Sequence, residues 1–188
     1  PYTTLFRSHL LPFDIAETNI SYYALCALMF SVGLSVGNDP QTLKNFRSLN
    51  PRLVFLPVMT ILGTLAGSAA VSLILTHRSI TDCLAVGSGF GYYSLSSIFI
   101  TEYKGAELGT IALLANISRE ILTLLAAPLL VRWFGNLAPI SAGGATTMDT
   151  TLPIITRTAG QQFVVVSIFH GFVVDFSVPF LVTLFCSI

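Results

Sequence analysis

The residues best suited to chemistry lie in the stretch AGGATTMDTTLP, residues Ala142–Pro153, which places one carboxylate among glycines and threonines. The neighbouring sequence is strongly apolar, and the run Phe163–Ile188 is long enough to cross a bilayer. A charge at mid-bilayer costs at least about 3 kcal/mol on insertion scales, so a carboxylate in such a segment is a functional candidate. Asp149 also suits the N-cap of a helix that continues through Pro153, and capping is compatible with substrate contact.

A second stretch, GSGFGYYSLSS at Gly87–Ser97, has the same glycine- and hydroxyl-rich character. Irregular backbone at membrane depth survives only inside protein or along a wet cavity, because unsatisfied peptide groups are costly there. Paired glycine-interrupted segments indicate a transporter's binding site, whereas isolated glycines simply permit close helix packing. The pair of stretches, together with the carboxylate, favours a site, and its candidate residues are Ser88, Gly89, Tyr92, Gly143, Gly144, Thr147 and Asp149.

The motif NISRE places three polar side chains near the middle of the apolar run Leu108–Val131. Asn116, Arg119 and Glu120 are spaced by three and four residues, so they share one face of a helix. In one interpretation Arg119 and Glu120 neutralise each other and hold helices together. In the other, this polar face lines the same cavity as Asp149.

The last apolar run contains two further titratable residues, His170 and Asp175. Five residues correspond to about 500° of helix rotation, so the two side chains diverge by roughly 140°. Gly171 follows His170 and allows another backbone to approach. His170 is therefore either a hydrogen-bonded core histidine or a proton relay, and Asp175 is equally open to a structural or a functional role.

The composition indicates that these residues sit in a membrane protein. Hydrophobic residues make up 53% of the chain and charged residues 10%, with a mean hydropathy of +0.78, whereas soluble domains carry about 25% charged residues. The net charge of zero does not favour nucleic acid as a partner. Phosphate-binding loops, zinc-binding histidine pairs and nucleophile elbows are lacking, so we expect no enzyme, cofactor or metal site.

The apolar runs predict an all-α integral membrane protein with about five to six transmembrane segments, two of them glycine-rich discontinuous helices. The expected spans are roughly 19–37, 53–76, 83–101, 108–131, 140–155 and 163–188. If each span crosses in turn, five basic residues lie on one side of the membrane (Lys44, Arg47, Arg52, Lys104 and Arg157), and Arg78 and Arg132 lie on the other. Because Lys and Arg mark the cytoplasmic side, both visible ends of the chain are expected to face outward.

The first residues need separate treatment. PYTTLFRS, residues 1–8, is what the end of a common sequencing adapter encodes, so we exclude it from the fold as an artefact. Residues 9–18 are interpreted as the remnant of an extracytoplasmic loop, and residues 19–188 as the transmembrane transporter domain. We expect the natural protein to begin upstream of His9, with an apolar segment of about 20 residues before LPFDIAETN.

Four motifs in order carry a family resemblance: SGFGYYSLSSIFITE, GAELGTIALLANISREI, AGGATTMDTTLPII and FHGFVVDFSVPFL. Over Gly87–Leu181, about half the chain, it resembles the LysO-type lysine exporters of bacterial inner membranes. The resemblance implies export of L-lysine and its toxic analogue thialysine, and two intramembrane acidic residues. One maps onto Asp149, and the other belongs to an N-terminal region without a counterpart in this sequence. Either truncation removed it, or a small partner membrane subunit supplies it.

Together these features predict a multi-pass inner-membrane secondary transporter that exports lysine, by proton antiport. Asp149 is expected to hold the lysine ammonium, and half-helix N-termini its carboxylate. Arg119 is an alternative partner for the carboxylate, with Glu120 setting its position. The rival hypotheses are a non-transporting membrane scaffold or sensor subunit, and a sodium or other cation–proton antiporter.

Overall fold

The computed structural model describes residue 30 and residues 51–75 and 77–188. The chain divides into two compact units, residues 1–40 and 41–188, and all the helices described from residue 51 onward belong to the second unit. The span predicted at residues 19–37 and the segments 1–8 and 9–18 lie outside the described residues.

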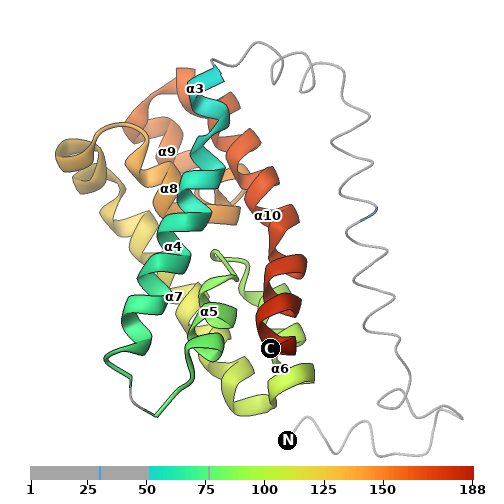
Figure 1. Cartoon of the computed structure of the whole chain (residues 1–188). Coiled ribbons are helices and arrows are strands. Elements are labelled where there is room, and N and C mark those ends of the chain that lie inside the picture. Colours follow the sequence, from blue (N-terminus) through green and yellow to red (C-terminus); the bar gives the residue numbers. More distant parts are fainter. Residues whose placement is uncertain (1–29, 31–50, 76) are drawn as a thin grey trace, which may run out of the picture. The chain divides into compact units, whose positions relative to one another are not determined.

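The described part of the second unit consists of helices and contains no strand. Two of its helices are long and apolar enough to cross a membrane, at Ala106–Phe134 and Gln161–Ser187, and Leu56–Ser72 is a shorter apolar helix. This agrees with the expected all-α membrane protein. The elements in chain order are α3 (Pro51–Val54), α4 (Leu56–Ser72), α5 (Ile80–Gly87), α6 (Tyr93–Lys104), α7 (Ala106–Phe134), α8 (Ala138–Gly143), the 3₁₀ helix η1 (Gly144–Met148), α9 (Leu152–Ala159), the 3₁₀ helix η2 (Gln161–Phe163) and α10 (Val164–Ser187) (Figure 1).

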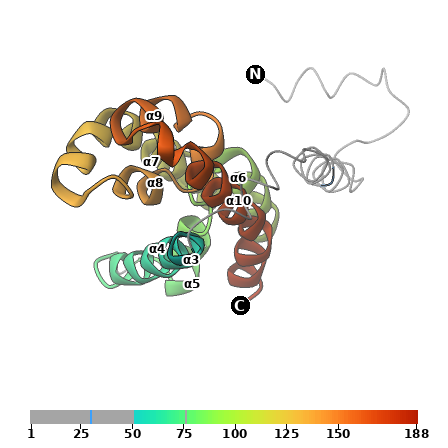
Figure 2. The same ribbon diagram turned by 90° about the horizontal axis from the view of Figure 1, so that it is seen from above.

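Local sequence explains where these helices begin and end. The Ser79 side chain caps α5 by accepting a hydrogen bond from Asp82 N at 3.0 Å. Gly105, Gly135 and Gly160 have φ of 91°, 87° and 113°, and each ends a helix in a conformation that side chains disfavour. In the second unit α4 packs beside α5, and α8 and α9 pack beside α7 (Figure 2).

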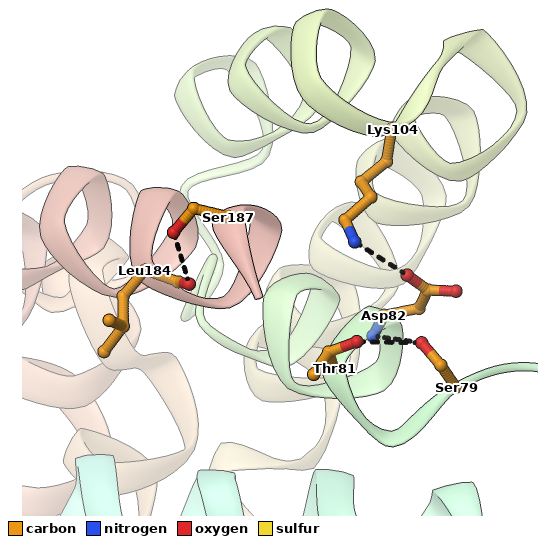
Figure 3. A network of polar contacts seen from close by, with 6 residues as sticks. All are labelled: Ser79, Thr81, Asp82, Lys104, Leu184 and Ser187. Atoms are coloured by element: carbon orange, nitrogen blue, oxygen red, sulfur yellow. Dashed lines mark hydrogen bonds and ion pairs between the residues drawn. The ribbon is translucent and has the colours of Figure 1, made fainter.

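Helices α5 and α6 form a hairpin whose two arms start and finish at the same end of the unit. Lys104 Nζ, at the end of α6, lies 4.0 Å from Asp82 Oδ1, near the start of α5 (Figure 3). Arg78, just before α5, forms an ion pair with Glu107, just after α6. A continuous helix would separate Asp82 from Lys104 by about 33 Å. The segment, which we name the first hairpin (residues 80–104), therefore turns back.

Helices α8 and α9, joined by η1, form a second hairpin (residues 138–159). Ile140 of α8 and Ile155 and Ala159 of α9 share one buried apolar cluster, although a continuous helix would place Ile140 and Ala159 about 28 Å apart. The same cluster contains Val166 near the start of α10. Residues from the end of α7, from α3 and from the start of α4 also pack on it, among them Val131, Leu53 and Leu56.

The two hairpins change the predicted topology. The sequence predicted that the segments at residues 83–101 and 140–155 each cross the membrane, but in the structure each returns to the end from which it entered. Lys104 therefore lies at the same end as Arg78, and Arg132 at the same end as Arg157. The physical reason is length, because an eight-residue arm such as α5 extends only about 12 Å.

Candidate functional site

The tips of the two hairpins meet between the long helices. Ala145 N donates a hydrogen bond to Phe90 O at 2.9 Å, which joins the backbones directly. We name this contact the tip junction and define it as residues 88–92 and 143–149. A Cβ on Gly144 would collide with Phe90 O, and one on Gly91 would lie 3.1 Å from Gly143 O. The glycines are therefore needed so that the two backbones can touch.

Asn116 of α7 ties the first hairpin to the tip junction. Its side chain is 3% exposed. Its Oδ1 accepts a hydrogen bond from Gly91 N at 2.8 Å, and its Nδ2 donates to Val86 O at 3.2 Å. Val86 O is one of the last carbonyls of α5, so Asn116 satisfies the C-terminal end of that half-helix. A Cβ on Gly89 would strike the Asn116 amide.

Arg119, one turn further along α7, does the same for the second hairpin. Its Nε donates to Ala142 O at 2.8 Å and its Nη2 to Ser141 O at 3.1 Å, both at the end of α8. The guanidinium also contacts Thr64 Oγ1 and lies 5.9 Å from the centre of the Phe90 ring. A cation at a helix C-terminus is favourable, because it opposes the negative end of the helix dipole.

This arrangement bears on the first interpretation of Arg119, in which it pairs with Glu120. Across the described part of the chain, no ion pair joins it to Glu120, which is half-buried on α7. Three of the five guanidinium N–H groups are used by the protein itself. Arg119 therefore binds the C-terminal end of α8 through its guanidinium group.

His170 is fully buried and links three elements. Its Nε2 lies 2.9 Å from Thr60 Oγ1 of α4, and its Nδ1 lies 3.2 Å from Thr147 Oγ1 of η1. The Thr147 hydroxyl has one proton and lies 2.9 Å from Ser167 O, so it accepts from His170 Nδ1–H. His170 is thus a hydrogen-bonded core histidine. Of the two interpretations from sequence, the geometry favours the structural one.

Asp149 lies at the end of the tip junction and is exposed. Its carboxylate accepts a hydrogen bond from Thr150 N, whereas the N-cap residue of α9 is Thr151, without a side-chain capping bond. The capping interpretation of Asp149 is therefore not what the structure shows. Ser88, in contrast, is buried, and its hydroxyl donates to Leu84 O at 2.7 Å within the first hairpin.

Two further groups face Asp149. Tyr92, at the N-cap position of α6, interacts electrostatically with Asp149 and with Asp175 of α10. Asp175 is only 5% exposed. Sequence reasoning left Asp175 undecided. The signal that could have singled it out is its position four residues after Gly171, because residues at this spacing share a helical face.

A cavity of about 610 Å³ lies between α4, α5 and α7. His77, Arg78 and Asp82 line the part near the connection between α4 and α5, and Asn116 and Arg119 line the part near the tip junction. The side chains between them are mainly apolar, including Leu108 and Ile111. Neither Asp149 nor Asp175 lines this cavity, so the two carboxylates lie outside it.

Comparison with known proteins identifies the family. The family model described as "Lysine exporter LysO" matches residues 4–186. The chain is 38% identical over 170 residues to "Lysine exporter LysO" of Escherichia coli (strain K12), which covers 90% of this chain and 56% of that protein. It is 36% identical over 165 residues to "Putative lysine exporter" of Haemophilus influenzae, which covers 88% of this chain and 83% of that protein. No solved structure matches.

The chain thus spans about half the length of the E. coli relative and most of the H. influenzae one. The names of both relatives describe transporters rather than enzymes, in agreement with the expectation from sequence. These matches confirm the resemblance carried by the four motifs, and the chain belongs to the lysine exporter LysO family.

Proposed function

We propose that this chain forms the hairpin-containing part of a secondary transporter that exports L-lysine and thialysine across the bacterial inner membrane by proton antiport. The observation that carries the proposal is the backbone contact between Ala145 and Phe90, which brings two opposed half-helix hairpins together. Transporter sites form where discontinuous helices meet near mid-membrane. The names of the relatives support an amino acid as cargo.

The charges at the tip junction are complementary to lysine, a zwitterion that carries a second ammonium on its side chain. The negative C-terminal ends of α5 and α8 are already satisfied by Asn116 and Arg119. The positive N-terminal ends of α6 and α9, at Tyr93 and Leu152, remain to attract the substrate's carboxylate. Asp149, exposed beside them, would hold the side-chain ammonium. A small N-terminal partner subunit, or the N-terminal region of a longer chain, would supply the second acidic residue that the family resemblance implies.

In the membrane we propose that α4, α7 and α10 cross, together with the predicted span at residues 19–37, and that the hairpins enter from opposite sides. Arg52, Arg132 and Arg157 then belong to one end, and Arg78 and Lys104 to the other. Lys44 and Arg47 precede α3 in the sequence. The excess of basic residues makes the end with Arg132 cytoplasmic.

Topology reporters separate this arrangement from six successive crossings. A reporter fused after Gly105 is expected to read periplasmic, and one fused after Gly135 cytoplasmic, because the first hairpin returns to its own side. Alternating crossings give the opposite result at both positions. A fusion after Arg78 is the control, since both arrangements place it in the periplasm. Opposite signals at Gly105 and Gly135, with the control correct, would rule out the hairpins as membrane elements.

Inverted membrane vesicles test the function itself. They should be made from cells that express the complete gene, with any partner subunit that the genome encodes. An acid interior is expected to drive uptake of labelled lysine, because each proton that leaves would be exchanged for a lysine cation. A sodium gradient at uniform pH should drive none. Sodium-driven or sodium-only flux would identify a cation antiporter, and an absence of all flux would favour a scaffold.

A further inference from the structure

The described chain contains a second carboxylate at the depth of the tip junction. Asp175 is the twelfth of the 24 residues of α10, so it lies at the middle of a helix long enough to cross a membrane. It is 5% exposed, and in the described part of the chain no hydrogen-bond donor or basic side chain pairs with it. A carboxylate in such a position is costly unless it holds a proton or a cation.

The backbone geometry brings Asp175 to Asp149. Gly171 is the point of contact, because a Cβ there would lie 2.7 Å from Met148 N and 2.9 Å from Thr147 Oγ1. Asp149 follows Met148 directly, and Asp175 lies one helical turn beyond Gly171 on the same face of α10. The two carboxylates and the Tyr92 hydroxyl consequently interact with one another.

No basic group of the described residues offsets these carboxylates. Lys104 and Asp82 face α10 beside Cys186, about three helical turns away from Asp175. Arg119 faces His170, on another side of α10, and is bound to α8. Arg157 lies in the last turn of α9, away from the tip junction. The other titratable groups on the helices packed against α10 are Cys83, Tyr93, Glu102 and Tyr103, which are not cationic.

We propose that Asp149 and Asp175, with the Tyr92 hydroxyl, form a dicarboxylate site in which Asp175 carries the proton exchanged for the substrate's ammonium. Asp175 is buried and lies near the like charge of Asp149, so its ionised form is costly and it holds a proton. When an ammonium binds at exposed Asp149, its positive charge replaces that of the proton. Asp175 then releases the proton to water, and one cation is exchanged for one proton. This proposal rests on the proposed function, and it assigns Asp175 as the residue that couples lysine export to proton movement.

Transport by Asp175→Asn separates coupling from binding. In proteoliposomes without a pH gradient, exchange of labelled for unlabelled lysine should persist, because Asp149 still binds the ammonium. Net lysine uptake driven by a pH gradient should be lost. The matched control is Glu102→Gln, which removes an exposed carboxylate near the end of α6 and should leave both activities unchanged. Loss of exchange together with net uptake, or retention of both, in a protein that elutes as a single species from gel filtration, would overturn the proposal.

A chemical readout tests the pair without any transport. Dicyclohexylcarbodiimide attacks carboxyl groups that are protonated in apolar surroundings, and peptide mass spectrometry locates the adduct. Asp175 of the wild type should be labelled at neutral pH, and Asp149→Asn should reduce that labelling, because the like charge that retains the proton is gone. An unlabelled Asp175, or labelling unaffected by Asp149→Asn, would overturn the pair even if lysine export holds. Labelling as expected in a protein that moves no lysine would instead overturn the proposed function.

Discussion

Asp149→Asn is expected to insert and accumulate like the wild type and to abolish thialysine resistance. Asn keeps the volume of the side chain and can still accept a hydrogen bond from Thr150 N, so the local turn should form. It cannot carry a negative charge, and therefore cannot hold an ammonium beside the positive ends of α6 and α9. The measurement is growth on thialysine of a host that lacks lysine export, with membrane abundance determined by immunoblot.

Two further variants sharpen this test. Asp149→Glu should retain partial resistance at best, because the extra methylene moves the carboxylate by about 1 Å, and such displacements are costly where geometry is fixed. Glu102→Gln removes an exposed carboxylate remote from the tip junction and should grow like the wild type. If Asp149→Asn confers full resistance at equal abundance, the ammonium is bound elsewhere, and Asp149 has no part in transport.

The positions at which the helices break could be predicted from the sequence. Helix α5 ends at Gly87 and α6 begins at Tyr93, inside the stretch GSGFGYYSLSS, and α8 ends at Gly143 inside AGGATTMDTTLP. Glycine permits the positive φ found at Gly91 and Gly144, and threonine hydroxyls satisfy local carbonyls, as Thr146 does for Gly143. These effects are local, so residue types alone reveal them.

The direction of the chain after each break could not be predicted in this way. An apolar arm that crosses and an apolar arm that returns have the same composition. The return of the first hairpin brings Asp82 near Lys104 and Arg78 near Glu107, and these partners are distant in sequence. Helix periodicity carries no information about such contacts.

The hydrogen-bond partners of Arg119 could not be predicted from the sequence either. Its spacing to Asn116 correctly placed both on one face of α7, and both reach the tip junction. Its neighbour Glu120 is rotated by about 100°, so adjacent positions on a helix are poor partners. The partners of Arg119 are the carbonyls of Ser141 and Ala142, which tertiary structure alone brings to it.

Gly144→Ala is expected to disrupt the tip junction and to destabilise the protein strongly. Gly144 has φ 65° and ψ −126°, a conformation that an L-residue adopts only under strain, and its Cβ would collide with Phe90 O. Backbone strain together with loss of the bond from Ala145 N to Phe90 O should cost roughly 3 kcal/mol or more. For a chain of this size that corresponds to a fall in melting temperature of about 6 °C or more. The measurement is thermal denaturation in detergent, followed by gel filtration.

Gly67→Ala is the matched control for this substitution. Gly67 lies inside α4, and a Cβ there would meet nothing within 4 Å. Alanine lowers the conformational entropy of the unfolded chain and favours helix, so this variant should melt at or slightly above the wild-type temperature. Since both variants add one methyl group to an apolar protein, only their positions differ. Equal melting temperatures for the two would mean that the backbones of the hairpins do not touch, and the site built on that contact would have to be abandoned.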